Sequence, residues 1–289
     1  MSTLLEPFEF AFFRNGLLVA SLAGALCGLI GVYVTLRGMS YIGHGLSHAI
    51  FGGAAASAVI SVNFYIGAGV WGLASALMIG RVTRRRVIGS DAAIGVITTA
   101  SFALGLALTN RFGSASKSVD AALFGSILGV SGADVWVVAG VAVLAVATVF
   151  GGYRALLFTT FDPEVAEASG VRTARVDALL MGVLAVSILA TMKVLGVVLI
   201  AASLVIPAVV ARMLTDSFAR MLWLSALLGG LCGFVGMNLS YHLDVSSGAA
   251  IVLVGAALFG VVFAVTGRTR LGRVSGMDPH PAAIGRPGT

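Results

Sequence analysis

The chain alternates between long apolar runs and short polar breaks. A helix that crosses a bilayer core about 30 Å thick needs roughly 20 mostly apolar residues, and runs of that length recur throughout the sequence. The pattern predicts an all-α protein with about nine transmembrane helices. Their expected ranges are Asn15–Leu36, Tyr41–Ser61, Asn63–Gly80, Asp91–Asn110, Ala133–Gly152, Thr173–Met192, Val194–Ala211, Arg220–Leu239 and Ser247–Thr266. A single membrane domain over residues 1–266 therefore takes up almost the entire chain.

One further apolar segment, Val119–Gly129, is too short to cross the bilayer. It follows the polar stretch Asn110–Ser118, and we expect it to form a half-helix that enters the membrane from one side. Depending on how this segment is counted, the chain has about eight to ten crossings.

The composition agrees with a lipid environment. Of the 289 residues, 58% are hydrophobic and 10% charged, and the mean hydropathy is +1.04, whereas about a quarter of a soluble domain is charged. A transmembrane β-barrel is excluded because runs such as Val135–Phe150 are continuously apolar rather than alternating. Many of the 38 glycines lie inside these runs. Small residues spaced three or four apart, as at Gly24, Gly28 and Gly31 or at Gly229 and Gly233, let helices approach closely in lipid and predict packing faces.

The charges indicate the orientation of the chain in the membrane. With the N-terminus outside, 14 of the 18 basic residues fall in cytoplasmic segments and 4 fall outside, as the positive-inside rule requires. We therefore expect a cytoplasmic C-terminus, with residues 267–289 as a flexible tail. The net charge of +6 comes without a basic stripe and interleaved aromatic residues, so no nucleic-acid partner is expected.

The longest internal cytoplasmic stretch, Tyr153–Arg172, contains the sequence FDPEVAEASG. Asp162 can cap a helix whose first residue is Pro163, and Gly170 can close it. The pattern predicts a short helix outside the membrane. Such a helix is either an ordinary surface helix or a docking element for a cytoplasmic partner.

The sequence GHGLSHA, at Gly43–Ala49, holds the most suggestive polar pair in an apolar run. His44 and His48 are four residues apart and project from one face of a helix. Neutral imidazoles at this spacing can bind a transition-metal ion together, with Ser47 as a candidate hydrogen-bond partner. The alternative is that both are hydrogen-bonded packing residues. Two histidines do not complete a coordination sphere, so further ligands must come from other helices or a facing subunit.

A second polar group, SYHLDVSSG, lies on the outer side in this topology and contains His242 and Asp244. These two residues are weaker metal candidates than the histidine pair. Asp244 is better explained as an N-terminal cap of the following helix.

Neither an enzyme nor an ATP site is indicated. The segment Gly113–Ser118 lacks a glycine before Lys117 and follows no strand, so it is not a phosphate-binding loop. No catalytic base or nucleophile accompanies the histidines. We expect a translocation subunit without a permanently bound cofactor, whose energy comes from another protein.

These residues resemble the integral-membrane permeases of ABC importers for zinc, manganese and iron(II), which have the type II importer architecture. The blocks that carry the resemblance are LRGMSYIGHGLSHA at Leu36–Ala49, SDAAIGV at Ser90–Val96, LFGSIL at Leu123–Leu128, FDPEVAEASGV at Phe161–Val171, LVIPAVVAR at Leu204–Arg212 and YHLDVSSGAAIVLV at Tyr241–Val254. They cover most of the chain in the expected order.

The resemblance implies a homodimeric pathway in a bacterial plasma membrane, two cytoplasmic ABC ATPase subunits and an extracellular solute-binding protein that delivers the ion. FDPEVAEASGV is similar to the family's coupling helix. Its implied ATPase-coupling residues are Phe161, Asp162, Pro163, Glu164, Ala166 and Gly170.

The family's metal position resembles an aspartate and a histidine four residues apart, which correspond here to His44 and His48. Replacing a hard carboxylate by a borderline nitrogen favours zinc over manganese as the transported ion. Two alternatives are a secondary metal carrier and an ABC permease for an iron chelate. The crossings hold few acidic residues for ion coupling, and only 8% of residues are aromatic, so a bare ion moved by an ABC importer is favoured.

Overall fold

The computed structural model describes residues 6–59, 61–84, 89–112, 125 and 130–274, and these residues are helical or lie in turns between helices. The all-α prediction is confirmed. The elements are η1 (Glu6–Glu9), α2 (Ala11–Leu36), α3 (Ile42–Val59), α4 (Phe64–Arg84), α5 (Ser90–Phe112), α7 (Gly132–Gly151), α8 (Tyr153–Phe161), α9 (Pro163–Ala168), α10 (Thr173–Leu195), α11 (Ile200–Leu214), α12 (Phe218–Leu243) and α13 (Ser247–Val274).

Each of the expected crossings corresponds to one helix of the described chain. Seven of these helices are long and apolar enough to span a membrane. The other two are α3, with 18 residues, and α11, with 15 residues. In the described part of the chain, seven helices thus meet the requirements for a crossing where nine were expected, and α11 is short for a full crossing.

One predicted boundary is wrong. The crossing expected to begin at Val194 begins later, because α10 runs to Leu195 and α11 begins at Ile200. The last apolar span is Ser247–Thr266, as expected, and its helix continues to Val274. Within the half-helix expected at Val119–Gly129, the structure describes only Gly125, which has a φ of +77° and is not helical. The rest of that segment lies outside the described residues.

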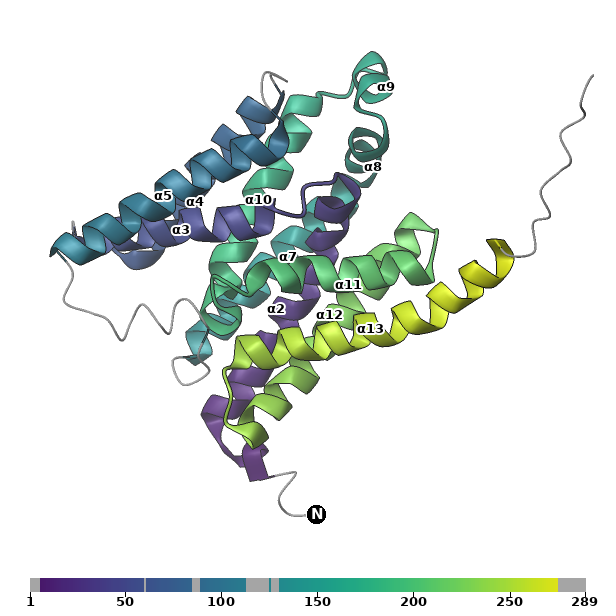
Figure 1. The fold of residues 1–289 in the computed structure, drawn as a ribbon. Helices are drawn as coiled ribbons and strands as arrows, with labels where there is room; N and C mark the ends of the chain where they lie inside the picture. The colour runs from purple at the N-terminus through teal and green to yellow at the C-terminus, as the bar shows by residue number, and fades with distance from the viewer. Residues whose placement is uncertain (1–5, 60, 85–88, 113–124, 126–129, 275–289) are drawn as a thin grey trace, which may run out of the picture.

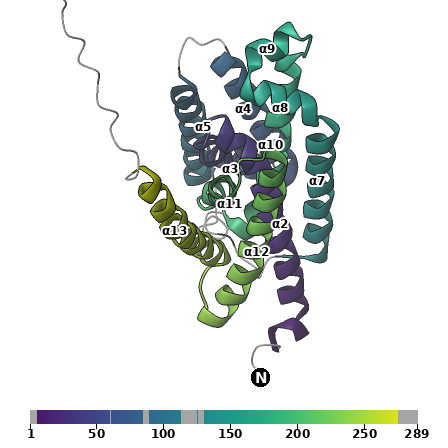
Figure 2. The same cartoon turned by 90° about the vertical axis from the view of Figure 1, so that its right-hand side faces the viewer.

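Helix α2 forms the centre of the molecule. Its apolar window is 78% buried, against 17% for α7. It packs most extensively on α12 and also contacts α7, α10 and α11, while α3 packs on α4 and α5. Helix α10 contacts both groups. In Figures 1 and 2, α2 runs from the N-terminal end of the molecule towards α8 and α9 at the opposite end.

Glycines bring α2 and α12 into backbone contact, as their spacing predicts. A Cβ atom at Gly24 would overlap the backbone of Gly229, and one at Gly28 would overlap the backbone of Ser225. The hydroxyl of Ser225 donates a hydrogen bond of 2.6 Å to the carbonyl oxygen of Gly28. Gly31 approaches α11 in the same way, at Leu204. Close backbone approach therefore holds the central helices together.

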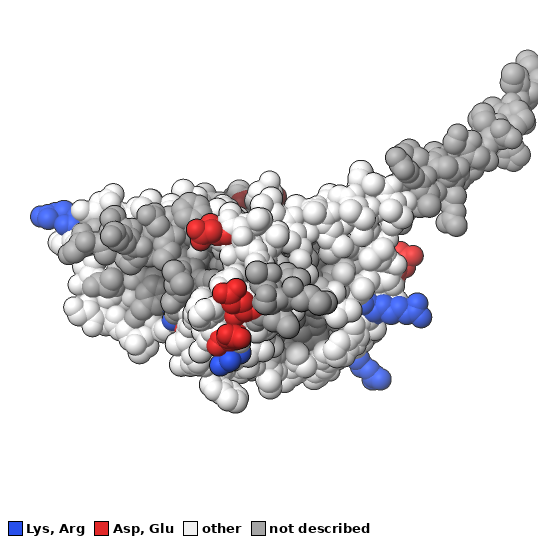
Figure 3. Space-filling model, turned by 90° about the horizontal axis from the view of Figure 1, so that it is seen from below, with Lys and Arg blue, Asp and Glu red and all other residues white. Residues whose placement is uncertain are grey.

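The outer surface of the bundle is apolar. Large apolar side chains are exposed on α7, α12 and α13, among them Trp136, Trp223 and Phe263 at 80%, 63% and 58%. Figure 3, seen from the N-terminal end, shows a mostly uncharged surface with a small group of acidic side chains near its centre. Such a surface suits lipid or apolar protein contacts rather than water.

Candidate functional site

The two histidines lie one turn apart near the start of α3. Their ring centroids are 4.3 Å apart, and the ring planes are inclined by 48°. His44 is exposed, whereas His48 is half-buried and lies 4.6 Å, centroid to centroid, from the ring of Phe102 on α5. The spacing of four residues thus places both imidazoles on one face of α3.

A backbone contact orients the His48 ring. Its Nδ1 atom lies 3.0 Å from the carbonyl oxygen of His44. Because a carbonyl oxygen only accepts, Nδ1 carries the proton in this hydrogen bond, and Nε2 of the neutral ring keeps its lone pair. Metal-binding histidines are commonly held by such a bond from the other ring nitrogen. Nε2 of His48 is therefore the nitrogen that can bind a metal ion.

Two contacts fix the first turns of α3 against the centre of the bundle. The Ser47 hydroxyl lies 2.8 Å from the carbonyl oxygens of both His44 and Val197, and it donates to them as a shared hydrogen bond. Gly43 lies against Ala201 and Leu204 of α11, where a Cβ would collide with the Leu204 side chain. Ser47 thus holds the backbone of α3 rather than an imidazole ring.

Val197 belongs to the connection between α10 and α11, which the apolar pattern places a few residues too early. Gly196 has a φ of +75°, a conformation that glycine adopts without steric cost. Two carbonyl oxygens at this connection accept hydrogen bonds from other helices: that of Val197 from Ser47, and that of Val194 from Ser247 at 2.9 Å. These two hydrogen bonds join α3 and α13 to the connection between α10 and α11.

His242 and Asp244 lie at the end of α12, a helix that packs on α2, α11 and α13 rather than against the histidine pair. Both side chains are exposed. Asp244 has a φ of +53° and is the C-cap of α12. It is not the N-cap of α13, as the sequence predicts, because the Ser246 hydroxyl accepts from the Ala249 amide in that position, at 3.4 Å.

The histidine pair does not form a complete metal site. Among the residues that the structure describes, no three histidine, cysteine, aspartate or glutamate side chains come together as a ligand group. Imidazole-bound transition metals generally take four or more ligands. An ion at His44 and His48 therefore needs ligands from water, from the backbone or from another chain.

The short helix predicted outside the bundle is present as α9, and its end signals are those expected from the sequence. The Asp162 carboxylate accepts a hydrogen bond of 2.9 Å from the Val165 amide, and Pro163 is the first helical residue. At the other end, Gly170 has a φ of +83°, and the Val171 amide donates to the Ala166 carbonyl at 3.0 Å. This is the Schellman arrangement of a helix C-terminus.

The exposure of these residues divides them into two groups. Phe161, Asp162, Pro163 and Glu164 are exposed, whereas Ala166 is fully buried within the chain. Ala166 is therefore not available for contact with a partner, contrary to the role that the resemblance implies. A small side chain at this position instead lets α9 pack against α8 and α10.

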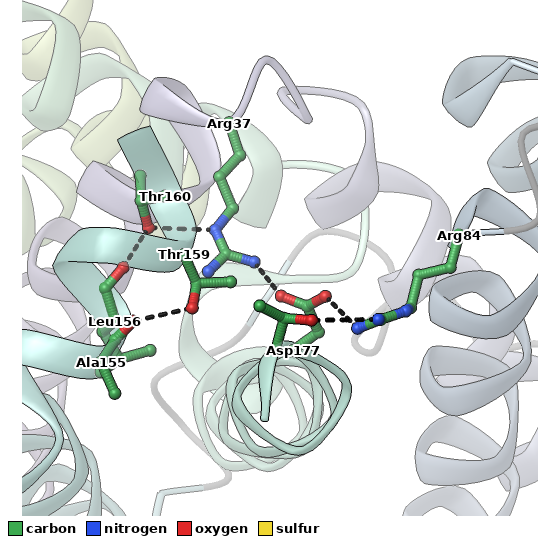
Figure 4. A network of polar contacts seen from close by, with 8 residues as sticks. Arg37, Arg84, Ala155, Leu156, Thr159, Thr160 and Asp177 are labelled. Atoms are coloured by element: carbon green, nitrogen blue, oxygen red, sulfur yellow. Dashed lines mark hydrogen bonds and ion pairs between the residues drawn. The ribbon is translucent and has the colours of Figure 1, made fainter. Parts of the chain in front are cut away.

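A network of ionic and polar contacts lies beside α9, and the sequence does not single it out. Asp177 of α10 binds Arg37 at 2.7 Å through one carboxylate oxygen and Arg84 at 2.9 Å through the other. Arg37 also donates to Thr160 at 3.2 Å, and Arg84 donates to Thr173 at 3.1 Å. Figure 4 shows Asp177 between the two arginines. An acidic residue inside an expected crossing is the signal that could have revealed this site.

A second network ties helices at the opposite end. Lys193 of α10 binds Asp134 of α7 at 2.8 Å, and the Tyr65 hydroxyl of α4 donates to the same carboxylate at 3.1 Å. The Lys193 ammonium also lies 5.2 Å from the centre of the Tyr65 ring. Helix α10 thus has an ion pair at each of its ends.

Apolar helices in backbone contact define a polytopic membrane protein, and one of its inner helices carries a histidine pair. The sequence matches the ABC 3 transport family over residues 9–266. Because this match covers most of the chain, the protein belongs to that family. The resemblance to ABC importer permeases is confirmed.

Individual relatives agree with this assignment. The chain is 37% identical to a manganese transport system membrane protein, MntC, of Halalkalibacterium halodurans over 89% of this chain and 88% of the relative. It is 36% identical to a manganese import system permease protein, ScaB, of Streptococcus parasanguinis over 91% and 93% of the two chains. The structure is similar to that of PsaBC from Streptococcus pneumoniae in complex with Fab, with a TM-score of 0.85, 31% identity and coverage of 95% and 99%.

Proposed function

We propose that this chain is the translocation subunit of an ATP-driven importer that carries a divalent transition-metal ion into the cytoplasm of a bacterium. The observation that carries the proposal is the orientation of the histidine pair. His44 and His48 lie 4.3 Å apart between ring centroids, and the contact with the His44 carbonyl leaves Nε2 of His48 free to bind an ion. A pair of neutral imidazoles suits a transition-metal ion better than a hard cation such as Ca²⁺.

Manganese is the first candidate for the transported ion, because the relatives described above are named for manganese transport. Zinc is the second, because nitrogen ligands at both positions of the pair match its borderline character. The sequence alone favours zinc, and the relatives reverse that order. Membership of an ABC transporter family removes the support for a secondary carrier.

The incomplete ligand set supports a dimer. Two copies of the chain that face each other across one pathway would bring together two histidine pairs. Four imidazole nitrogens would then be available, which is the number that a tetrahedral site needs. A transient site also benefits from incomplete coordination in each subunit, since an ion that is held by four fixed ligands leaves slowly.

Two ABC ATPase subunits are proposed to dock on α9 in the cytoplasm. The exposed residues Phe161, Asp162, Pro163 and Glu164 form the contact surface, and Gly170 permits the turn that closes the helix. Because both ends of α9 are capped, the helix is a rigid element that can transmit a displacement caused by a partner. An extracellular solute-binding protein is proposed to deliver the ion to the opposite face.

This arrangement implies an orientation with the N-terminus outside and the C-terminus in the cytoplasm. Arg37 caps the C-terminal end of α2, which points towards α8 and α9, and the N-terminus lies at the other end of the molecule (Figure 1). Arg84, at the end of α4, is joined to Arg37 through Asp177. The positive-inside rule then puts the end with Arg37 and Arg84 in the cytoplasm.

The test is metal uptake by proteoliposomes that contain the chain with its ATPase and binding protein. We expect uptake of radioactive manganese that requires ATP and stops when the ATPase is replaced by a hydrolysis-deficient variant. Competition with unlabelled zinc ranks the two ions. Uptake that continues without ATP hydrolysis would refute the proposed function. If zinc is taken up at a lower concentration than manganese, the order of the two ions is reversed.

A further inference from the structure

The ionic network at the end of the molecule that carries α9 joins three helices, α2, α4 and α10, through one carboxylate. Asp177 of α10 receives Arg37 from the end of α2 and Arg84 from the end of α4, one on each oxygen (Figure 4). The side chains of Arg37 and Asp177 are only 11% and 22% exposed. Partly buried, charge-assisted hydrogen bonds of this kind are stronger and less screened than surface ion pairs.

On one side, the network reaches the helix proposed to dock the ATPase. Arg37 donates through Nε to the hydroxyl of Thr160, in the last turn of α8. Asp162, two residues further, is both the C-cap of α8 and the N-cap of α9. A displacement of α9 therefore moves the Thr160 hydroxyl, and with it the guanidinium of Arg37.

On the other side, the network reaches the helix that carries the histidine pair. Arg84 is the last residue of α4, and α4 packs tightly on α3 through glycines. A Cβ at Gly53 of α3 would overlap Trp71, and a Cβ at Gly72 of α4 would overlap Ile50. Helices in such close contact move as one body, so a displacement of Arg84 by its ion-pair partner also displaces α3 together with α4.

The contact between α4 and α10 is loosely packed beside the ion pair. An open pocket of about 360 Å³ lies between the helices there, lined by Leu77, Gly80 and Met181 with Arg84 and Asp177 themselves. Beside this space, the Asp177–Arg84 ion pair and the hydrogen bond from Arg84 to Thr173 join α4 to α10. A carboxylate that bridges two arginines can keep that link while the helices shift.

The same end holds unpaired polar atoms. In the part of the chain that the structure describes, the buried side-chain atoms without a hydrogen-bond partner are Tyr33 Oη, Thr35 Oγ1, Arg37 Nη2 and Thr83 Oγ1. All of them lie in the last turns of α2 and α4 or directly after α2. A buried donor without a partner is destabilising, so this region gains free energy in an arrangement that supplies partners. The polar end of α2 and α4 is thus suited to two alternative sets of contacts.

We propose that Asp177 is a positioning residue that couples movement of α9 to movement of the α3–α4 pair and its histidines. This inference rests on the proposed function, since it describes how ATP hydrolysis in the partner reaches the ion. The carboxylate transmits displacement along the path Thr160, Arg37, Asp177 and Arg84. Without the negative charge, the two arginines repel each other and the link between α2 and α4 opens.

The test compares Asp177→Asn with Asp134→Asn in the reconstituted transporter. Both substitutions remove one partly buried aspartate charge from an ion pair of α10 or its neighbour, and both networks include a residue of α4. Only Asp177 lies beside α9. The readouts are metal uptake per ATP hydrolysed and the melting temperature of the complex. Asp177→Glu, which keeps the charge, is the conservative variant.

We expect Asp177→Asn to lower the uptake per ATP hydrolysed by about 2- to 30-fold, the range typical for residues that carry coupling between sites. Asp134→Asn should lower the melting temperature without changing this ratio, and Asp177→Glu should restore most of it. An unchanged ratio in Asp177→Asn, or an equal fall in both asparagine variants, would overturn the inference. If the unsubstituted complex hydrolyses ATP without any uptake, the proposed function itself fails, which is a separate and recognisable result.

Discussion

The contact between α2 and α12 gives a sharp prediction for the stability of the fold. Gly24 of α2 and Gly229 of α12 face each other so closely that a Cβ on either one would overlap the backbone of the other. The substitution Gly24→Ala adds one methyl group at this point. Because the obstacle is a backbone carbonyl rather than a flexible side chain, the methyl group fits only if the two helices move apart.

The cost follows from three contributions. Overpacking a tight contact costs about 1–3 kcal/mol. Moving the helices apart also weakens the 2.6 Å hydrogen bond from Ser225 to the Gly28 carbonyl, one turn away, which contributes about 1 kcal/mol. Against these costs, replacing glycine by alanine inside a helix stabilises the helix by up to about 1 kcal/mol. The net destabilisation is then roughly 1–3 kcal/mol, or a fall of about 2–6 °C in melting temperature for a chain of this size.

The assay is thermal unfolding of the purified protein in detergent, followed by loss of the monodisperse peak in size-exclusion chromatography. Gly140→Ala is the matched control, because a Cβ at Gly140 of α7 meets no atom within 4 Å. Its melting temperature should stay the same or rise slightly. If Gly24→Ala and Gly140→Ala melt at the same temperature, glycine contacts do not hold the two central helices together.

Further substitutions test the local contacts. Asp162→Ala should lower the stability of α9 by about 1 kcal/mol through loss of its cap and reduce the amount of ATPase that co-purifies. Asp162→Asn retains a capping oxygen and should behave like the unsubstituted chain. Equal losses in the two variants would show that the charge of Asp162 matters rather than its capping bond. Ser47→Ala leaves the Val197 carbonyl without its side-chain donor, which should cost about 1–3 kcal/mol in thermal unfolding. Exposed Ser40→Ala should change stability by less than about 0.5 kcal/mol, and a similar shift in both serine variants would contradict the anchoring role of Ser47.

Features that depend on neighbouring residues could be predicted from the sequence. The apolar runs located the membrane helices, since lipid makes hydrophobicity the dominant constraint on a crossing. The caps of α9 were predictable because Asp162, Pro163 and Gly170 act on the backbone within a few residues of themselves. The common face of His44 and His48 follows from helix geometry alone.

Features that depend on distant partners could not be predicted. Asp177 and Arg37 are 140 residues apart, and nothing in either segment identifies the other. Gly196 resembles the many glycines that only pack helices together, so the start of α11 was placed too early, at Val194 instead of Ile200. Asp244 was misassigned because an aspartate between two helices can end the first or begin the second, and only its φ of +53° distinguishes the two.

The most direct test of the account is metal uptake by His48→Ala in the reconstituted transporter, with His242→Ala as the control. His48 presents a free Nε2 on the inner helix α3, whereas His242 is exposed at the end of α12. We predict that His48→Ala abolishes ATP-dependent metal uptake while the complex assembles and its ATPase remains active, and that His242→Ala transports normally. Normal uptake in His48→Ala, or a loss confined to His242→Ala, would contradict the assignment of the histidine pair as the transport site.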